Sequence, residues 1–256
     1  MADYDAALAG FAGLDAEALS RPWIWQGGKM DVRYALYRTL EDAQQVAVTV
    51  AAQPHPVARR ILALAQRAFG DLRGLMTGIP DELLDLRPHE QEWSLRETLR
   101  HIIWIERRYA TQARYAVDRH DSDPIRVATD RLVPEADIDA TGNAVAILTR
   151  LAAARVESHR RLDDVAPSAM TRPTQWMHYD VDLRFRLHRF AAHVNEHTVQ
   201  CEKTLATLGW RATEGRRIVR LVASAIGEIE GLGASEQART LEAALAERFA
   251  SVTATA

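Results

Sequence analysis

The stretch His193-Val194-Asn195-Glu196-His197 lies inside a long helical pattern near residues 179–208. Two side chains four positions apart lie one turn above each other on the same face of an α-helix. Two imidazoles placed in this way can chelate one divalent metal ion, which then needs a third ligand from another part of the chain. We expect His101, near the start of an earlier helix, to supply that ligand.

Length and composition are those of an ordinary globular protein, with 256 residues, 47% hydrophobic and 26% charged. The net charge of −3 provides no basic field for nucleic acid or anionic lipid. Cys201 is the only cysteine, which excludes an internal disulfide and a thiolate-built zinc cluster. Because no apolar run could span a membrane and no signal peptide is evident, we expect a cytoplasmic protein with no membrane partner.

Apolar residues recur at spacings of three and four over most of the chain, which predicts an all-α protein. No segment alternates with period two for long enough to predict a strand, and no internal repeat is evident. We expect a central four-helix bundle (56–209) with helical extensions at the N-terminus (1–55) and the C-terminus (210–256). The predicted helices cover about 31–52, 57–78, 94–118, 143–163, 179–208 and two shorter segments, one ending at Gly231 and one starting at Ser235.

The second helix of this bundle has a specific start, because Ser94 and Glu97 form a capping-box pattern. Residues 119–141 show no sustained period, and a connection this long can cross the bundle and make its second and third helices parallel. The second and fourth helices are then antiparallel. At 1.5 Å per residue, His101 lies roughly 10 Å from the start of its helix and His197 roughly 16 Å from the end of its own. Antiparallel packing therefore brings the histidines to similar heights.

Three imidazoles would leave at least one coordination position of a metal open, as in a catalytic rather than a structural site. Zinc, nickel and iron all accept such ligands. The simpler alternative is that His-x-x-x-His arises by chance and that these are hydrogen-bonded core residues. His197 shares an apolar seam with Val194 and Cys201, and a buried imidazole there needs a partner, which favours the metal site.

Two sequence segments resemble DinB-like proteins. Arg87-Pro88, Glu92-Trp93-Ser94 and Leu99-Arg100-His101 resemble the Pro…Trp-Ser…His segment of that family, and residues 193–200 resemble its second motif. The resemblance covers about residues 57–209 and implies a bundle with a crossover connection. It also implies that His101, His193 and His197 are the ligands of a divalent metal ion. The family includes mycothiol- and bacillithiol-dependent S-transferases and maleylpyruvate isomerases. Nothing in the sequence indicates DNA contact.

Other residues near the motifs have open roles. Glu196, between the two histidines, is a candidate catalytic base or an orienting group, the alternative being a solvent-facing acid. We expect Glu106 to pair with a cation on a neighbouring helix. His159 is the main rival for a ligand, with a core role as the alternative. We expect three residues before the fourth helix, Trp176, His178 and Tyr179, either to line the pocket mouth or to pack. Cys201 follows His197 by four and either approaches the metal or is a buried, inert thiol, as is more common.

The sequence leaves three functions open. The first is a metal-dependent enzyme that uses a small-molecule thiol and an electrophilic substrate, an S-transferase or isomerase whose nucleophile comes from the thiol. The second is a non-catalytic module, metal-binding or metal-free and stress-related or regulatory, whose extensions form an interface such as that of a homodimer. The third is a metal-dependent hydrolase in which Glu196 acts on water.

Overall fold

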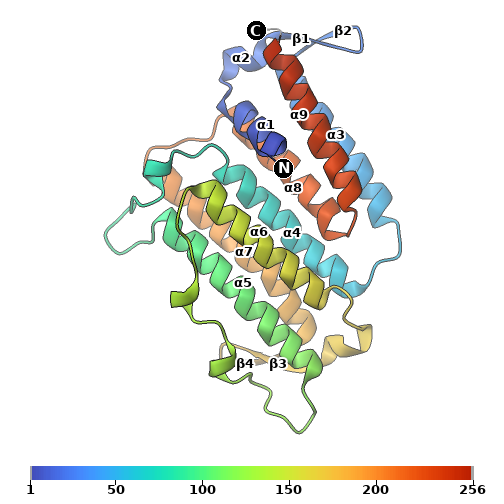
Figure 1. Ribbon diagram of the computed structural model, residues 1–256, viewed down its shortest axis with the longest axis vertical. Coiled ribbons are helices and arrows are strands. Elements are labelled where there is room, and N and C mark those ends of the chain that lie inside the picture. Colours follow the sequence, from blue (N-terminus) through green and yellow to red (C-terminus); the bar gives the residue numbers. More distant parts are fainter. Residues whose placement is uncertain (1, 255–256) are drawn as a thin grey trace.

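The computed structural model describes residues 2–254, most of which are helical (Figure 1). Within this range there are two β-hairpins, β1 (Pro22–Trp25) with β2 (Gly28–Asp31) and β3 (Pro173–Trp176) with β4 (Tyr179–Asp182). None of the helices in residues 2–254 has the length and apolar character needed to cross a membrane. The helices are α1 (Ala2–Gly13), α2 (Ala16–Ser20), α3 (Val32–Ala51), α4 (Val57–Met76), α5 (Leu95–Asp118), α6 (Ala144–Leu162), α7 (Leu183–Thr207), α8 (Glu214–Gly231) and α9 (Ser235–Ala254).

Helices α4, α5, α6 and α7 form the predicted bundle around an apolar core. Arg96, near the start of α5, contacts the backbone just before α6, and Arg114, near the end of α5, contacts Arg161 near the end of α6. These contacts make α5 and α6 parallel. Tyr109 of α5 packs on Phe190, earlier in α7 than the histidines that meet His101, so α5 and α7 are antiparallel. The predicted directions are therefore confirmed.

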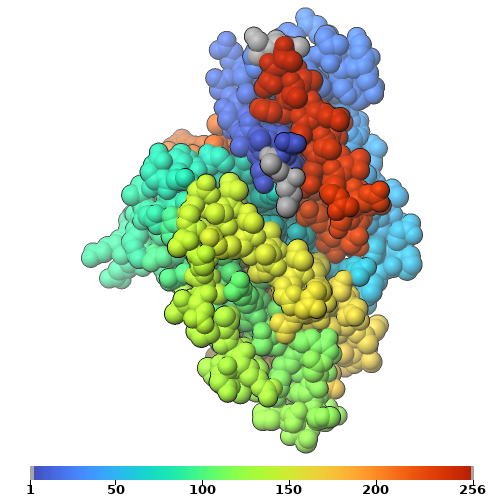
Figure 2. All heavy atoms as spheres, in the orientation of Figure 1, coloured from blue at the N-terminus to red at the C-terminus, as the bar shows by residue number. Residues whose placement is uncertain are grey.

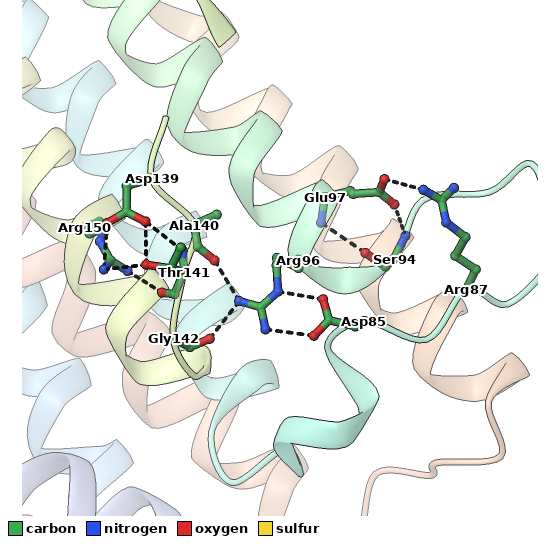
Figure 3. A network of polar contacts seen from close by, with 10 residues as sticks. All are labelled: Asp85, Arg87, Ser94, Arg96, Glu97, Asp139, Ala140, Thr141, Gly142 and Arg150. Carbon is green, nitrogen blue, oxygen red and sulfur yellow. Dashed lines mark hydrogen bonds and ion pairs between the residues drawn. The ribbon is translucent and has the colours of Figure 1, made fainter. Parts of the chain in front are cut away.

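The crossover from α5 to α6 is fixed at the end where both helices begin (Figure 3). Arg96 pairs with Asp85 and donates from Nη1 to the carbonyl oxygens of Ala140 and Gly142, both at 2.7 Å. The capping box predicted for Ser94 and its partner three residues later is formed. Charge-assisted hydrogen bonds of this kind are stronger than neutral ones, so they hold the start of α5 and of α6 at one level.

The prediction that the chain contains no strand is wrong, as is the start of the fourth bundle helix at residue 179. Residues 179–182 form strand β4, and α7 begins only after Asp182, whose side chain accepts a hydrogen bond from the backbone N–H of Phe185. Each strand has four residues. Strands this short cannot show an alternating pattern that stands out from a helical one.

The structure also overturns the expectation that the chain has no internal repeat. The units β1–β2–α3 and β3–β4–α7 have the same register, the same cap and the same Arg-on-Trp contact. Both hairpins also turn through a non-glycine residue with positive φ, Gln26 at 50° and Met177 at 54°. Identical residues at matching places are Arg21 and Arg172, Pro22 and Pro173, Trp25 and Trp176, Asp31 and Asp182, Arg33 and Arg184, Leu36 and Leu187, and Arg38 and Arg189.

The two ends of the chain share one core. Helices α1 and α3 pack with α8 and α9 around a separate set of buried apolar side chains. Figure 2 shows the blue N-terminal and red C-terminal segments together in the upper part of the molecule, above the green and yellow segments. In the order α8, α9, α1, α3, these helices repeat the contacts of α4 with α6 and α7 and of α5 with α6 and α7. The segments expected as two extensions therefore form a second bundle, in which the chain order is permuted.

The two bundles meet through α4 and α8, which run antiparallel with glycines facing the opposite backbone. A Cβ atom on Gly70 would lie 2.2 Å from the carbonyl oxygen of Ala223, a distance that real atoms do not adopt. The interface is two-fold in character, because Gly70 and Gly227 each lie nine residues after the isoleucine of a shared Arg-Arg-Ile-x-x-Leu sequence pattern. The facing residues are Gly70 with Ala223, Gly74 with Arg220, Gly227 with Gln66, and Gly231 with Ala63.

Candidate metal centre

Three imidazoles converge between α5 and α7. His193 Nε2 lies 3.2 Å from His101 Nε2 and 3.0 Å from His197 Nε2. Two nitrogens of a tetrahedral zinc site, each about 2.0–2.1 Å from the metal, are separated by about 3.3 Å. Among residues 2–254, this is the group of His, Cys, Asp and Glu side chains that could hold a metal ion. The antiparallel directions of α5 and α7 thus bring together the residues that the sequence selected.

Hydrogen bonding and burial around the rings suit a bound cation. Gln200 Oε1 lies 2.7 Å from His197 Nδ1, which donates to it and so leaves Nε2 as the ring nitrogen that faces the other imidazoles. Burial and the other imidazoles lower the pKa of His101 to about 4 and that of His193 to about 2. Neutral imidazoles are the form that binds metal, so the residues present fit a divalent ion.

Aromatic rings hold two of these imidazoles in place. The ring of Trp93 lies 4.8 Å from that of His101, and the ring of Tyr109 lies 5.6 Å from that of His193 on the other side. His193 and His197 are buried, at 7% and 8% exposed, whereas His101 is partly open to solvent. The Trp93 side chain comes directly before the capped start of α5, so the same local signal positions both the helix and this ring.

A cavity of about 630 Å³ opens against the three histidines. Its walls come from α5, from α7, from hairpin β3–β4 and from residues 125–132 of the crossover. The Trp104 Nε1 atom donates to the carbonyl oxygen of Val133 at 2.9 Å and fastens the crossover to α5. The crossover and the hairpin therefore do more than connect helices, because together they enclose the space in front of the candidate metal position.

Comparison with known proteins gives a family model and a similar solved structure. The family model described as the DinB superfamily matches residues 64–201, more than half of the chain. The chain belongs to the DinB superfamily. Among solved structures, it is similar to YfiT from Bacillus subtilis, described as "a probable metal-dependent hydrolase with an unusual four-helix bundle topology". That match has a TM-score of 0.49 and 12% sequence identity, and covers 60% of this chain and 89% of YfiT. No curated protein matches the sequence.

The structure places the other sequence-selected residues of this DinB-superfamily bundle as follows. Glu106 is buried and pairs with Arg155 at 2.8 Å, as expected. His159 accepts a hydrogen bond from Arg155 at 3.0 Å and is not part of the histidine group. Cys201 is buried in the apolar core, and its burial raises the pKa of the thiol to about 12.

The residues expected near the pocket mouth divide into two groups. Glu196 lines the cavity, with an exposed side chain 3.6 Å from Arg189. Trp176 also lines it, whereas Tyr179 stacks on the ring of Trp176. Trp176 and Tyr179 both precede α7, as expected, but they lie in strands β3 and β4. His178 lies in the turn between these strands, with its ring 4.0 Å from that of Tyr179.

Sequence reasoning missed Gln200 and Arg186. Gln200 follows His197 by three positions and so lies on the same helix face, which is the signal that could have found it. Arg186 stands among the apolar positions of α7 and two turns before His193. A charge on the buried stripe of an amphipathic helix was the available signal for Arg186.

Proposed function

We propose that this chain is a divalent-metal-dependent enzyme that acts with a low-molecular-weight thiol, as an S-transferase or isomerase. The observation that carries the proposal is the convergence of three imidazoles on the wall of a cavity of about 630 Å³. His101, His193 and His197 would hold zinc, nickel or iron. A bound divalent ion would lower the pKa of a thiol and thereby supply a thiolate at neutral pH.

The nucleophile in this proposal comes from the cosubstrate and not from the protein. Cys201 is the only cysteine in the sequence, and it is buried with a pKa raised to about 12. Reactive cysteines have a lowered pKa and some exposure, so the Cys201 thiol is not a nucleophile. The role left to the protein is to bind, orient and exclude water, with Trp93 and Tyr109 fixing the imidazoles and Gln200 fixing the tautomer of His197.

Room for two substrates supports a transfer reaction. His197 lines the cavity described above and also a second one, of about 540 Å³, which lies between the segment before α5 and the end of α7. The second cavity includes Trp93 and Lys203. A thiol and an electrophile could therefore reach the histidines from different sides.

A hydrolase is the second candidate, favoured by the position of Glu196. The Glu196 side chain lines the same cavity as His193 and His197, where a carboxylate could accept a proton from water. Glu196 is also the residue whose replacement separates the two reactions.

The experiment combines metal analysis with two assays. The purified protein is loaded with zinc, nickel or iron(II), and the bound metal is quantified. It is then assayed with mycothiol, bacillithiol and glutathione against 1-chloro-2,4-dinitrobenzene, and separately with p-nitrophenyl esters. We expect thiol-dependent turnover that survives Glu196→Gln. Ester hydrolysis abolished by Glu196→Gln would support the hydrolase, and stoichiometric metal without either activity would support a non-catalytic module.

A further inference from the structure

The cavity in front of the histidines is rich in arginine. Arg108, Arg126, Arg186 and Arg189 line it, and Glu196 is the acidic residue among the described side chains of its wall. Apolar side chains, including Ile105, complete the lining. An excess of guanidinium groups over carboxylates in a partly enclosed space attracts a negatively charged ligand.

Arg186 is the most unusual member of this group. It is 2% exposed and lies over the ring of Tyr109 at 4.6 Å. Within residues 2–254 it has no ion pair or hydrogen bond, and its buried Nε atom has no partner. Burial, together with the nearby guanidinium groups of Arg189 and Arg108, lowers its pKa to about 10. A buried charge without a partner is costly, which indicates a ligand that supplies the missing anion.

Neighbouring groups in the cavity are incompletely paired as well. Arg108 lies over the ring of Trp104 at 4.9 Å, without a carboxylate partner among the described residues, and burial lowers its pKa. The Oε1 atom of Gln112 and the Nε atom of Arg189 are also buried without a hydrogen bond. Unsatisfied polar atoms that line one cavity point to a polar group that belongs there.

The second bundle shows that the scaffold does not require Arg186. Ala35 occupies the matching place in α3, four residues after the capping aspartate in each unit. Arg189, in contrast, is matched by Arg38, and both stack on the hairpin tryptophan. Stacking on the hairpin explains Arg189, whereas Arg186 occurs only in the unit that carries the histidines.

We propose that this cavity binds a substrate with a carboxylate group, which Arg186 and Arg108 hold while its other end faces the histidines. The inference rests on the proposed function at one point only, namely that the end of the substrate near the histidines is the end that reacts. Arg186 is the buried guanidinium of this wall, and one anionic group beside it would supply its missing partner. A carboxylate carries one charge, whereas a phosphate monoester carries about two at neutral pH. The planar guanidinium fork also fits a carboxylate through two parallel hydrogen bonds.

The test uses the full-length, metal-free protein, so that its result depends neither on metal nor on turnover. The probes are 4-phenylbutyrate, its neutral amide and phenyl phosphate, measured by isothermal titration calorimetry. We expect 4-phenylbutyrate to bind more tightly than the other two. Arg186→Met should weaken it by about 10- to 100-fold, and Arg186→Lys by less. The matched control Arg184→Met, at an exposed position of the same helix, should bind like the wild type.

Thermal unfolding separates a ligand-binding role from a structural one. Without ligand, Arg186→Met should have a melting temperature equal to or above that of the wild type, because it removes an unpaired buried charge. A clear decrease would show that Arg186 supports the fold and would overturn the proposal. So would equal binding of the acid and the amide, equal binding by Arg186→Met, or tighter binding of phenyl phosphate. Carboxylate binding in a protein that takes up no metal would refute the proposed function alone.

Discussion

The units β1–β2–α3 and β3–β4–α7 share one backbone design and differ in the residues that face the bundle interior. In the second unit, His193 and His197 meet His101 of α5. In the first unit, Asp42 and Val46 stand at the matching places of α3. The hairpin, the capping aspartate and the stacked arginine are common to both units, so they build the scaffold. The histidines, found in one unit alone, are therefore the residues to associate with chemistry.

The bundle that lacks the histidines has a positively charged side chain between the two equivalent helices. Arg248 of α9, the counterpart of α5, donates to Asp42 at 2.6 Å and to Thr39 at 2.7 Å. A second guanidinium, that of Arg38, pairs with the same carboxylate. Here a permanent ion-pair network joins the two helices. In the bundle of α8, α9, α1 and α3 a side-chain guanidinium lies between these two helices, whereas the other bundle has three imidazoles between the equivalent helices.

Replacing the α7 histidines by the residues that stand at the matching places in α3 should have the largest effect. The double variant His193→Asp, His197→Val, which copies the first unit, should lose measurable zinc binding because a single imidazole of the three remains. Elemental analysis after dialysis against zinc, with circular dichroism to confirm the helical fold, checks this. The control is His188→Gln, at an exposed position of α7, which should keep full metal content. Zinc retained by the double variant would place the metal elsewhere.

Substitutions at the glycine contact between α4 and α8 should have the second-largest effect, and a substitution in either helix should reduce stability. Gly70→Ala and Gly227→Ala place a methyl group 2.2 Å and 2.6 Å from a backbone oxygen of the facing helix. Each should lower the free energy of unfolding by about 1–3 kcal/mol, with Gly70→Ala the greater. Urea unfolding measures the effect. The control Gly13→Ala, with no atom within 4 Å, should be neutral or slightly stabilising. A large effect on one side alone would contradict the two-fold interface.

Acid should weaken the two bundles differently because of His159, whose counterpart in α1 is the buried Leu8. Burial and the charges of Arg155 and Arg59 lower its pKa from 6.5 to about 3. As the pH falls below 6.5 the unfolded chain takes up a proton that the folded chain resists, so stability is lost between pH 6.5 and 3. His159→Leu should remove on the order of 2 kcal/mol of this pH dependence, measured by urea unfolding from pH 7 to 4. If the free energy of unfolding of His159→Leu depended on pH as that of the wild type does, the buried imidazole of His159 would not be the cause of the acid sensitivity.

The hairpin turns should give the smallest effects. Gln26 and Met177 adopt positive φ, which costs about 1 kcal/mol for residues other than glycine. Gln26→Gly and Met177→Gly should therefore each change stability by no more than about 1 kcal/mol, in the stabilising direction. Differential scanning calorimetry of the metal-free protein measures both. Opposite signs would show that the two turns are not equivalent.

The sequence predicted the local features well. The capping box of Ser94 fixed the start of α5, and the spacing of His193 and His197, with a long crossover, was enough to bring His101 to them. The hairpins were not predictable, because their strands are too short and their turns carry glutamine and methionine where glycine is usual. The second bundle was missed because its helices come from the two ends of the chain. Hydrophobic periodicity within one segment does not show which distant segment that helix will contact. Arg186 was missed because arginine is assigned to the exposed face when a helix is predicted from the spacing of its apolar residues.

The antiparallel glycine contact between α4 and α8 gives a single polypeptide the layout that elsewhere takes two identical subunits. In a homodimer every substitution occurs twice, so a site cannot be lost from one copy and kept in the other. Here each half has its own sequence, and a change in α3 leaves α7 untouched. One half of such a chain can serve as a scaffold while the other half retains the reactive side chains. The two halves are always present in a one-to-one ratio, whatever the protein concentration.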